Sequence, residues 1–198
     1  AVARRLSKGE YALTSIRVTF PEGTSILGMS RILMAALPTF DAERFKQIAS
    51  TSEGYLFPDT YFFLPNATPE SVLSDLRQTF NDKTTNLLPA ISLSGRTIED
   101  IVIMASLLEE EAQTEEDKSI VAALLWKRLD EGMALQVDAP FIYMLGKSSH
   151  DLTKDDLGFD SPYNTYLYTG LPPTPISNPG LESLTAALIP EETPYWFY

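Results

Sequence analysis

The sequence predicts an α+β fold, in which a mixed domain with a cleft at a helix-helix corner follows a small N-terminal subdomain. Three observations support this prediction. Residues 10–20 alternate between apolar and polar side chains, as a half-buried strand does. Residues 97–131 instead carry two successive helical patterns. The 198-residue chain is 44% hydrophobic, which is enough for one main core and a small companion.

The first elements have recognisable boundaries. After the strand at 10–20, Ser25 is expected to cap a helix that ends before Pro38. Asp41 is expected to cap a second, short helix that runs to Ile48.

The aromatic segment at residues 53–63 predicts one strand, or two strands interrupted at Pro58. Thr68 followed by Pro69 then marks a strong helix start, because threonine caps and proline suits the first helical position. The segment thus separates the early helices from a longer one.

Two helices are predicted to meet at three consecutive acids. Thr97 and Asp100 form a capping arrangement for the first helix, which ends in the acidic triplet 109–111. Thr114 is expected to cap the second helix, which Gly132 ends. The triplet therefore lies at a corner, where clefts commonly form.

Helical geometry separates the three acids. At about 100° per residue, Glu111 projects between Leu107 and Leu108 on the apolar face, Glu109 lies at its rim, and Glu110 points away. Apolar surroundings raise the pKa of a carboxyl towards the range of a general acid. Glu111 is the first candidate and Glu109 the second, against the simpler interpretation of a solvated, ion-paired helix end.

The remainder of the chain is less regular. Residues 135–140 indicate a short strand or loop, and residues 161–180 form a polar, aromatic loop with five prolines. A last helix is predicted at 181–188, and residues 194–198 suggest a strand that is cut short.

Composition excludes several classes of function. The net charge of −12 disfavours nucleic acid as a partner. The absence of cysteine excludes thiolate nucleophiles and cysteine zinc sites, and a single histidine, His150, excludes a histidine-rich metal site. The sequence predicts no metal and no cofactor. No run of about 18 apolar residues occurs, although a chain that starts at Ala1 could have lost an anchor.

Six motifs in order give a resemblance to a known family. They are EGYLFPDTY (53–61), ASLLEEEA (105–112), LQVDA (135–139), SPYNTY (161–166), GLPP (170–173) and ISNPG (176–180). Together they resemble the YceG/MltG family of endolytic murein transglycosylases. The resemblance runs from about Tyr11 to the C-terminus.

The resemblance implies a membrane-anchored enzyme on the extracytoplasmic face of the bacterial membrane, with its anchor outside this chain. It would cleave peptidoglycan strands between N-acetylmuramic acid and N-acetylglucosamine and leave 1,6-anhydro ends. Cell-wall synthases are expected partners. Residues 1–50 would form a LysM-like subdomain, shortened before Arg17, and residues 51–198 a catalytic domain whose final segment is missing.

The family pattern also implies site roles. Its Glu-x-Glu motif places the catalytic acid at Glu111, with Glu110 where members often carry lysine. Supporting or substrate-binding roles fall to Glu109, Gln136, Asp138, Tyr163, Asn164 and Tyr166. Gln136 and Asn164 could hydrogen-bond sugar substituents, and the two tyrosines could stack on sugar rings.

Two alternatives stay open. One is a muramidase-type hydrolase, in which Glu109 or Asp138 activates water. The other is a catalytically idle module that binds peptidoglycan or serves as a scaffold for the cell-wall synthesis machinery. Asn164 could equally be a turn residue, Asp138 a helix cap, and the tyrosines packed side chains.

Overall fold

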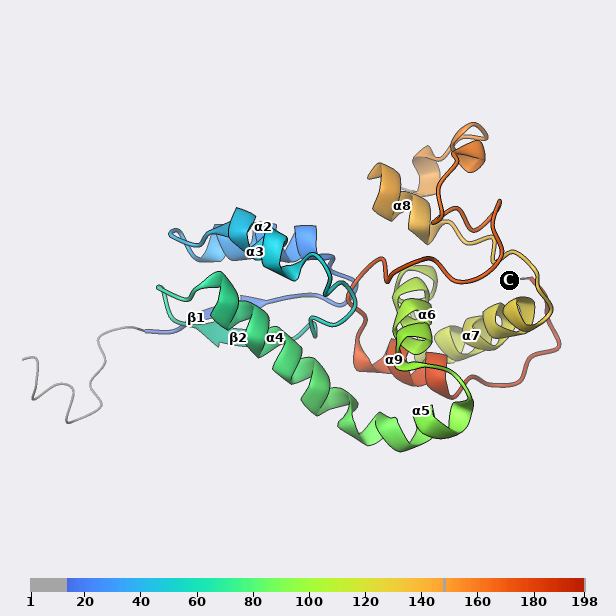
Figure 1. The fold of residues 1–198 in the computed structure, drawn as a ribbon, viewed down its shortest axis with the longest axis horizontal. Coiled ribbons are helices and arrows are strands. Elements are labelled where there is room, and N and C mark those ends of the chain that lie inside the picture. Colours follow the sequence, from blue (N-terminus) through green and yellow to red (C-terminus); the bar gives the residue numbers. More distant parts are fainter. Residues whose placement is uncertain (1–13, 148, 198) are drawn as a thin grey trace, which may run out of the picture.

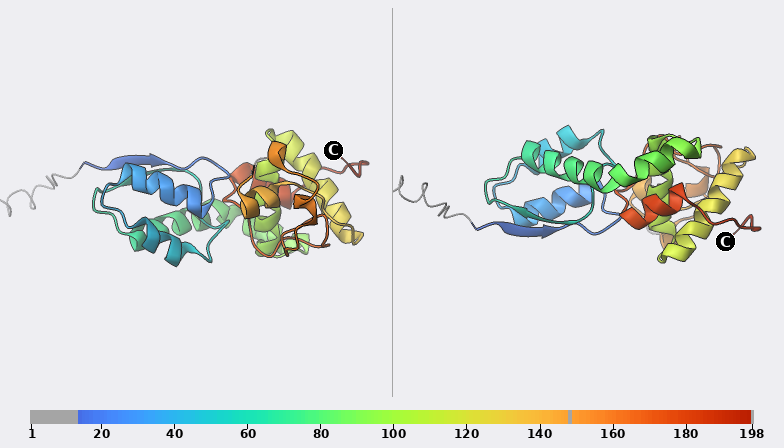
Figure 2. Two further views of the ribbon diagram at one scale, coloured as in Figure 1. Left: turned by 90° about the horizontal axis from the view of Figure 1, so that it is seen from above. Right: turned by 90° about the horizontal axis from the view of Figure 1, so that it is seen from below.

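The computed structural model describes residues 14–147 and 149–197 and has the predicted α+β composition. Two lobes lie side by side along the long axis, with the small sheet in the first and most of the helices in the second (Figures 1 and 2). The predicted strand at residues 10–20 is confirmed over β1 (Ile16–Thr19), whereas residues 10–13 lie outside the described part.

The small lobe is built on a two-stranded antiparallel sheet. β1 pairs with β2 (Thr60–Phe63), with Ile16 opposite Phe63. The predicted helices are confirmed as α2 (Ile26–Ala36) and α3 (Ala42–Ala49), capped by Ser25 and Asp41. Their core also includes Leu56, Val72 and Leu76, from segments that follow residue 50 in the chain.

Helix α4 (Pro69–Thr84) connects the two lobes. Its N-terminal half buries Val72 and Leu76 in the small core, whereas Phe80 belongs to the core of the second lobe. A short 3₁₀ turn, η1 (Thr85–Leu87), and helix α5 (Leu88–Ser94) follow. The sequence did not predict α5, because its few apolar residues give no clear helical stripe. Two of them, Leu88 and Leu93, are exposed.

The second lobe surrounds helix α6 (Ile98–Glu111), which is buried without interruption from Ile101 to Leu108. Helices α7 (Glu115–Asp130) and α9 (Leu181–Leu188) pack against each other and against α6. All three were predicted. Helix α8 (Ala139–Leu145) projects from this body, followed by the 3₁₀ turns η2 (Ser149–Asp151) and η3 (Asp156–Gly158) (Figure 1).

Three local predictions need correction. Residues 135–140 were expected to be a strand or loop; residues 135–138 are a loop, but α8 already begins at Ala139, with Asp138 at its N-cap position and Pro140 in its first turn. Of the aromatic segment 53–63 only β2 is a strand. The final residues 194–197 are not a strand, because no neighbouring strand pairs with them and Arg128 instead binds the carbonyl of Trp196.

Within the described ranges, no helix combines the length and the apolar character that crossing a membrane requires.

Candidate active site

The acidic triplet ends α6, and its three side chains enter three different environments. Ala112 leaves the helix in an extended conformation, and Thr114 caps α7 by accepting a hydrogen bond from the Asp117 amide. Negative charge at a helix C-terminus is unfavourable, so each acid needs compensation from elsewhere.

Glu109 is a structural residue in a buried ion pair. Its Oε1 accepts from Lys118 Nζ at 2.9 Å, and its Oε2 accepts from the Gly180 amide at 2.9 Å and from Ser183 Oγ at 2.7 Å. The Glu109 and Lys118 side chains are only 8% and 4% exposed. The prediction that Glu109 lies at a rim is therefore wrong, because the α7 and α9 helices close over it.

Glu110 is exposed, as predicted, but it does not face open solvent. It lines a groove between the two lobes, together with Glu53 and Arg31. Surrounding protein atoms raise the pKa of Glu110, and the charges of Glu109 and Glu111 add to this effect.

Glu111 is half-buried and lines a separate pocket of about 270 Å³. Its Oε1 accepts a hydrogen bond from the Ala139 amide at 3.2 Å, at the start of α8. Gln136, Asp138 and Tyr166 line the same pocket. The structure thus brings together four of the seven residues that the sequence singled out.

Asp138 and Tyr166 form a hydrogen-bonded pair in this pocket. Tyr166 donates from its hydroxyl to Asp138 Oδ1 at 2.7 Å. Burial, this hydrogen bond and the charges of Asp138 and Glu111 raise the pKa of Tyr166 to about 12, so the phenol stays a donor at neutral pH. Asp138 stands before the first residue of α8 but makes no capping hydrogen bond with its side chain.

Gln136 has the one positive φ angle, 54°, among the non-glycine residues that the structure describes. Its amide donates to the Thr165 carbonyl at 2.9 Å. Thr165 Oγ1 accepts from the Val137 amide and donates to the Val137 carbonyl. A left-handed glutamine is uncommon and is often associated with function. The loop at 135–138 is therefore fixed against the 161–180 loop.

Asn164 and Tyr163 lie away from the pocket. Asn164 is fully buried, donates to the carbonyls of Leu157 and Phe159, and accepts from the amides of Tyr166 and Leu167. These contacts favour the turn role for Asn164 over direct contact with a sugar. Tyr163 bonds Thr174 at 2.7 Å, and its ring centroid lies 5.6 Å from that of Tyr143.

A buried polar hub that was not predicted joins the lobes. Glu53 accepts from the Ile26 amide at 3.0 Å and from Asn178 Nδ2 at 2.7 Å. The Asn178 side-chain oxygen accepts from the amides of Gly54 and Leu56. Both residues occur in the quoted motifs, but sequence spacing could not show that they meet.

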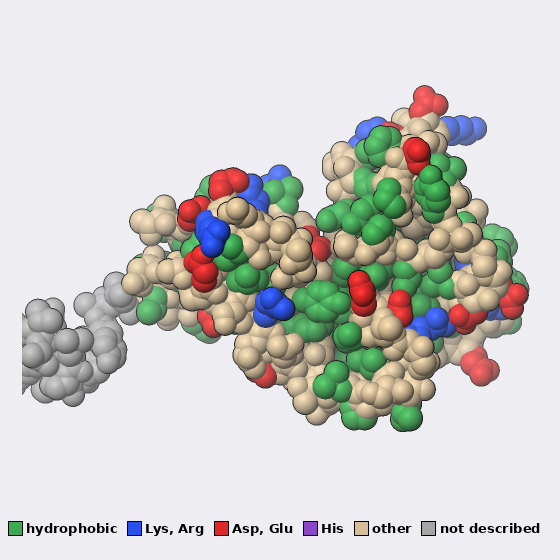
Figure 3. Space-filling view, in the orientation of Figure 1, with side chains coloured by type: hydrophobic (Ala, Val, Ile, Leu, Met, Phe, Trp, Pro, Cys, Tyr) green, Lys and Arg blue, Asp and Glu red, His purple; other side chains and the backbone are tan. Residues whose placement is uncertain are grey.

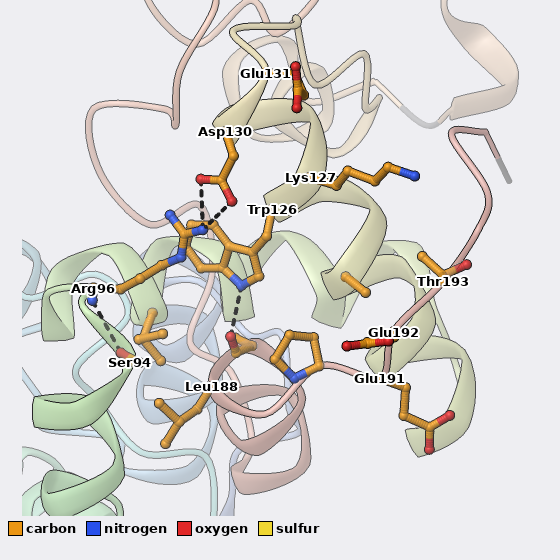
Figure 4. Close-up of a pocket in the computed structure, with 14 residues that line it drawn as sticks. Ser94, Arg96, Trp126, Lys127, Asp130, Glu131, Leu188, Glu191, Glu192 and Thr193 are labelled. Carbon is orange, nitrogen blue, oxygen red and sulfur yellow. Dashed lines mark hydrogen bonds and ion pairs between the residues drawn. The ribbon is translucent and has the colours of Figure 1, made fainter.

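Another hollow, of about 610 Å³, lies on the surface between α7 and the segment after α9 (Figure 4). Arg96 pairs there with Asp130 at 2.9 Å, and its guanidinium lies 3.9 Å from the ring centroid of Trp126. Trp126 donates to the Ala187 carbonyl. None of the predicted site residues lines this hollow, so we assign it no role in acid-base chemistry.

The fold and the pocket define a class of protein: an α+β protein with an acid at the end of a buried helix, facing a strained glutamine and a tyrosine-bound aspartate. The described residues contain no group of three or more side chains suited to hold a metal ion. The sequence pattern of the YceG-like family matches residues 1–198, and the chain belongs to this family.

Known relatives agree with this membership. The chain is 37% identical over 154 residues to an endolytic murein transglycosylase of Bacillus subtilis (strain 168), covering 77% of this chain and 43% of that protein. It is 31% identical over 141 residues to an endolytic murein transglycosylase of Streptococcus pneumoniae serotype 2, covering 69% of this chain and 26% of that one. The chain thus spans less than half the length of these relatives.

A solved structure has the same fold. The crystal structure of a yceG-like protein from Listeria monocytogenes superposes with a TM-score of 0.82 at 26% sequence identity, and the match covers 99% of this chain and 73% of that one.

Proposed function

We propose that this chain is the catalytic part of a lytic transglycosylase that cleaves peptidoglycan strands internally. The observation that carries the proposal is the meeting of Glu111, Gln136, Asp138 and Tyr166 in one pocket. Two relatives are endolytic murein transglycosylases, and they indicate the substrate.

Glu111 is the proposed general acid and base. Protonated Glu111 donates its proton to the glycosidic oxygen as the bond from that oxygen to C1 of N-acetylmuramic acid breaks. The C6 hydroxyl of the same sugar attacks C1, and the Glu111 carboxylate takes the hydroxyl proton. One bond to C1 breaks and one forms, no water is consumed, and the sugar is left as a 1,6-anhydro end.

The neighbouring groups fit this sequence of steps. Positive charge develops at C1, and the Asp138 carboxylate in the same pocket can stabilise it. Tyr166 fixes the orientation of Asp138 through the hydrogen bond of 2.7 Å. The Ala139 amide stabilises the carboxylate form of Glu111 between the two proton transfers. Gln136, which lines the same pocket, is the proposed partner of an acetamido group.

A muramidase-type hydrolase is the second candidate. Asp138 shares the pocket with Glu111 and could activate water instead of stabilising a cation. Glu109 does not fit that role, because Lys118, Gly180 and Ser183 already occupy its carboxylate.

Product analysis in ¹⁸O-labelled water distinguishes the two reactions. Isolated glycan strands are incubated with the chain, and the new ends are identified by mass spectrometry. Transglycosylation gives anhydro ends without ¹⁸O, whereas hydrolysis gives reducing ends that carry it. New ends that are all labelled would replace the transglycosylase proposal with the hydrolase, and no new ends at all would support the non-catalytic module.

The location of the protein is also proposed from the family resemblance. We infer that it acts on the extracytoplasmic face of the bacterial membrane, beside the cell-wall synthases, held there by an anchor outside these 198 residues. Cell fractionation of the whole protein tests this inference, and recovery of that protein in the cytosol would contradict it.

A further inference from the structure

The groove between α2 and α8 is not used by the proposed reaction. Its volume is about 770 Å³, compared with about 270 Å³ for the Glu111 pocket. In the space-filling view the surface is deeply hollowed between the two lobes (Figure 3). A groove of this size can hold a ligand larger than one sugar ring.

The groove adjoins the Glu111 pocket. Ala139 lines the groove, while its amide donates to Glu111 and the preceding Asp138 lines the pocket. On α6, Glu110 faces the groove and the next residue, Glu111, faces the pocket. A strand that passes over the start of α8 could therefore occupy both. An enzyme that cuts within a strand must bind on both sides of the cut bond.

The groove has two facing walls with exposed apolar side chains. Leu27 on α2 is 48% exposed and Tyr143 on α8 is 41% exposed. A tyrosine offers a ring face to a sugar and a hydroxyl for a hydrogen bond. The walls come from different lobes, and the hub of Glu53 and Asn178 holds those lobes together.

Arg31 supplies a positive charge to this groove. It is exposed, and it forms no ion pair within 4.0 Å with any residue in the described ranges. Arg17 and Arg77 also lack such a pair within the same ranges, so what distinguishes Arg31 is its position in the lining of the groove. A guanidinium binds carboxylates through two parallel hydrogen bonds.

Two carboxyl groups, those of Glu53 and Glu110, line the groove, and the pKa of each is raised. Burial raises the pKa of Glu53 to about 7, against the effect of its hydrogen bonds from Ile26 and Asn178. Burial also raises the pKa of Glu110. Near neutral pH Glu53 is therefore only partly ionised, and its carboxyl already accepts from Ile26 and Asn178.

We propose that this groove binds the peptide-bearing saccharide next to the bond that is cut, with Arg31 paired to a carboxylate of the peptide stem. This inference rests on the proposed function and names the form of the substrate. A stem adds amides, carboxylates and bulk to the glycan, which match the polar lining, the arginine and the width of the groove. In a strand without stems, the nearest carboxylate is that of the lactyl group, close to the sugar.

Binding measured on the Glu111→Gln chain tests the groove without cleavage. Calorimetry compares three soluble ligands: stem-bearing glycan fragments, the same fragments after removal of the stems, and N-acetylglucosamine oligomers, which have no carboxylate. We expect Arg31→Ala to weaken binding of the stem-bearing fragments about tenfold, as loss of a charge-assisted hydrogen bond does. The losses with the other two ligands are expected to be smaller.

The matched control is Arg77→Ala, an exposed arginine on α4 that does not line the groove. It should leave the binding of all three ligands unchanged. The inference would be overturned if the Glu111→Gln chain bound stem-bearing fragments equally well with Arg31 and with the Arg31→Ala substitution. An equal loss for stem-bearing and stem-free fragments would also overturn it, because it would assign Arg31 to the lactyl carboxylate. Cleavage plays no part in this binding measurement. Failure of the proposed reaction would therefore be seen only in the product analysis, and failure of the groove inference only in the calorimetry.

Discussion

Removal of the Lys118 ammonium should strongly destabilise the second lobe. In Lys118→Met, Glu109 keeps its bonds to Gly180 and Ser183 but loses the only ion pair found for it among the described residues. Both side chains of the pair are less than a tenth exposed, at 4% and 8%. Leaving one charge of a buried pair uncompensated costs about 3–5 kcal/mol.

Urea unfolding at pH 7 measures this cost, and an exposed ion pair in the same chain is the control. Arg44 and Glu70 also lie 3.0 Å apart, but their side chains are 47% and 57% exposed. Arg44→Met should therefore cost much less than Lys118→Met, because solvent screens an exposed ion pair. At roughly 2–4 °C per kcal/mol for a chain of this size, Lys118→Met should lower Tm by about 10 °C.

A double variant tests the cause. Adding Glu109→Gln to Lys118→Met removes the uncompensated charge and keeps an oxygen to accept from Gly180 and Ser183. Part of the lost free energy of unfolding should return. The reasoning would be refuted if Lys118→Met and Arg44→Met cost the same, or if the double variant were less stable than Lys118→Met.

Two further predictions concern the hub between the lobes. Burial raises the pKa of Glu53 from 4.5 to about 7, so its contribution to stability is complete below pH 4.5 and is lost as pH rises through about 7. Over this range the free energy of unfolding should fall by about 3 kcal/mol, and Glu53→Gln should abolish this dependence on pH. Urea unfolding of both chains between pH 5 and 8 measures it. The same dependence on pH in Glu53→Gln as in the unaltered chain would contradict the assignment to Glu53. Gly54→Ala should destabilise the chain far more than Gly132→Ala. Both glycines have a positive φ, but only at Gly54 would an added Cβ lie 2.5 Å from Pro175 Cγ. Equal Tm values for the two variants would exclude that contact.

The helices could largely be predicted because their signals are local. The cap at Thr68 with the following proline, and the cap at Thr97 with Asp100, mark helix starts that the structure reproduces. Helix α8 was indicated only by the alternative in which Asp138 caps a helix, because α8 is short and its first residues were interpreted as part of a strand or loop. The extent of the small lobe could not be obtained locally, because it depends on the pairing of β1 with β2 across some forty residues.

The site was harder to predict because helical projection describes only the helix that carries the residue. Projection placed Glu109 at a rim, but α7 and α9 bury it with Lys118 and Ser183. It placed Glu110 away from the core without revealing that the small lobe lies opposite it across the groove. The roles of Gln136, Asp138 and Tyr166 stay predictions, although the structure does place these three side chains around the pocket of Glu111.

The most direct test of the central claim is the rate of anhydro-end formation by Glu111→Gln on isolated glycan strands. Glutamine keeps the shape of the side chain and can still accept from the Ala139 amide, but it carries no proton to donate. Glu116→Gln, on an exposed acid in the first turn of α7, is the matched control. We predict that Glu111→Gln lowers the rate by at least about 100-fold, as loss of a general acid does, with Tm unchanged, while Glu116→Gln behaves as the unaltered chain. Release of anhydro ends by Glu111→Gln at the rate of the control would contradict the assignment of Glu111.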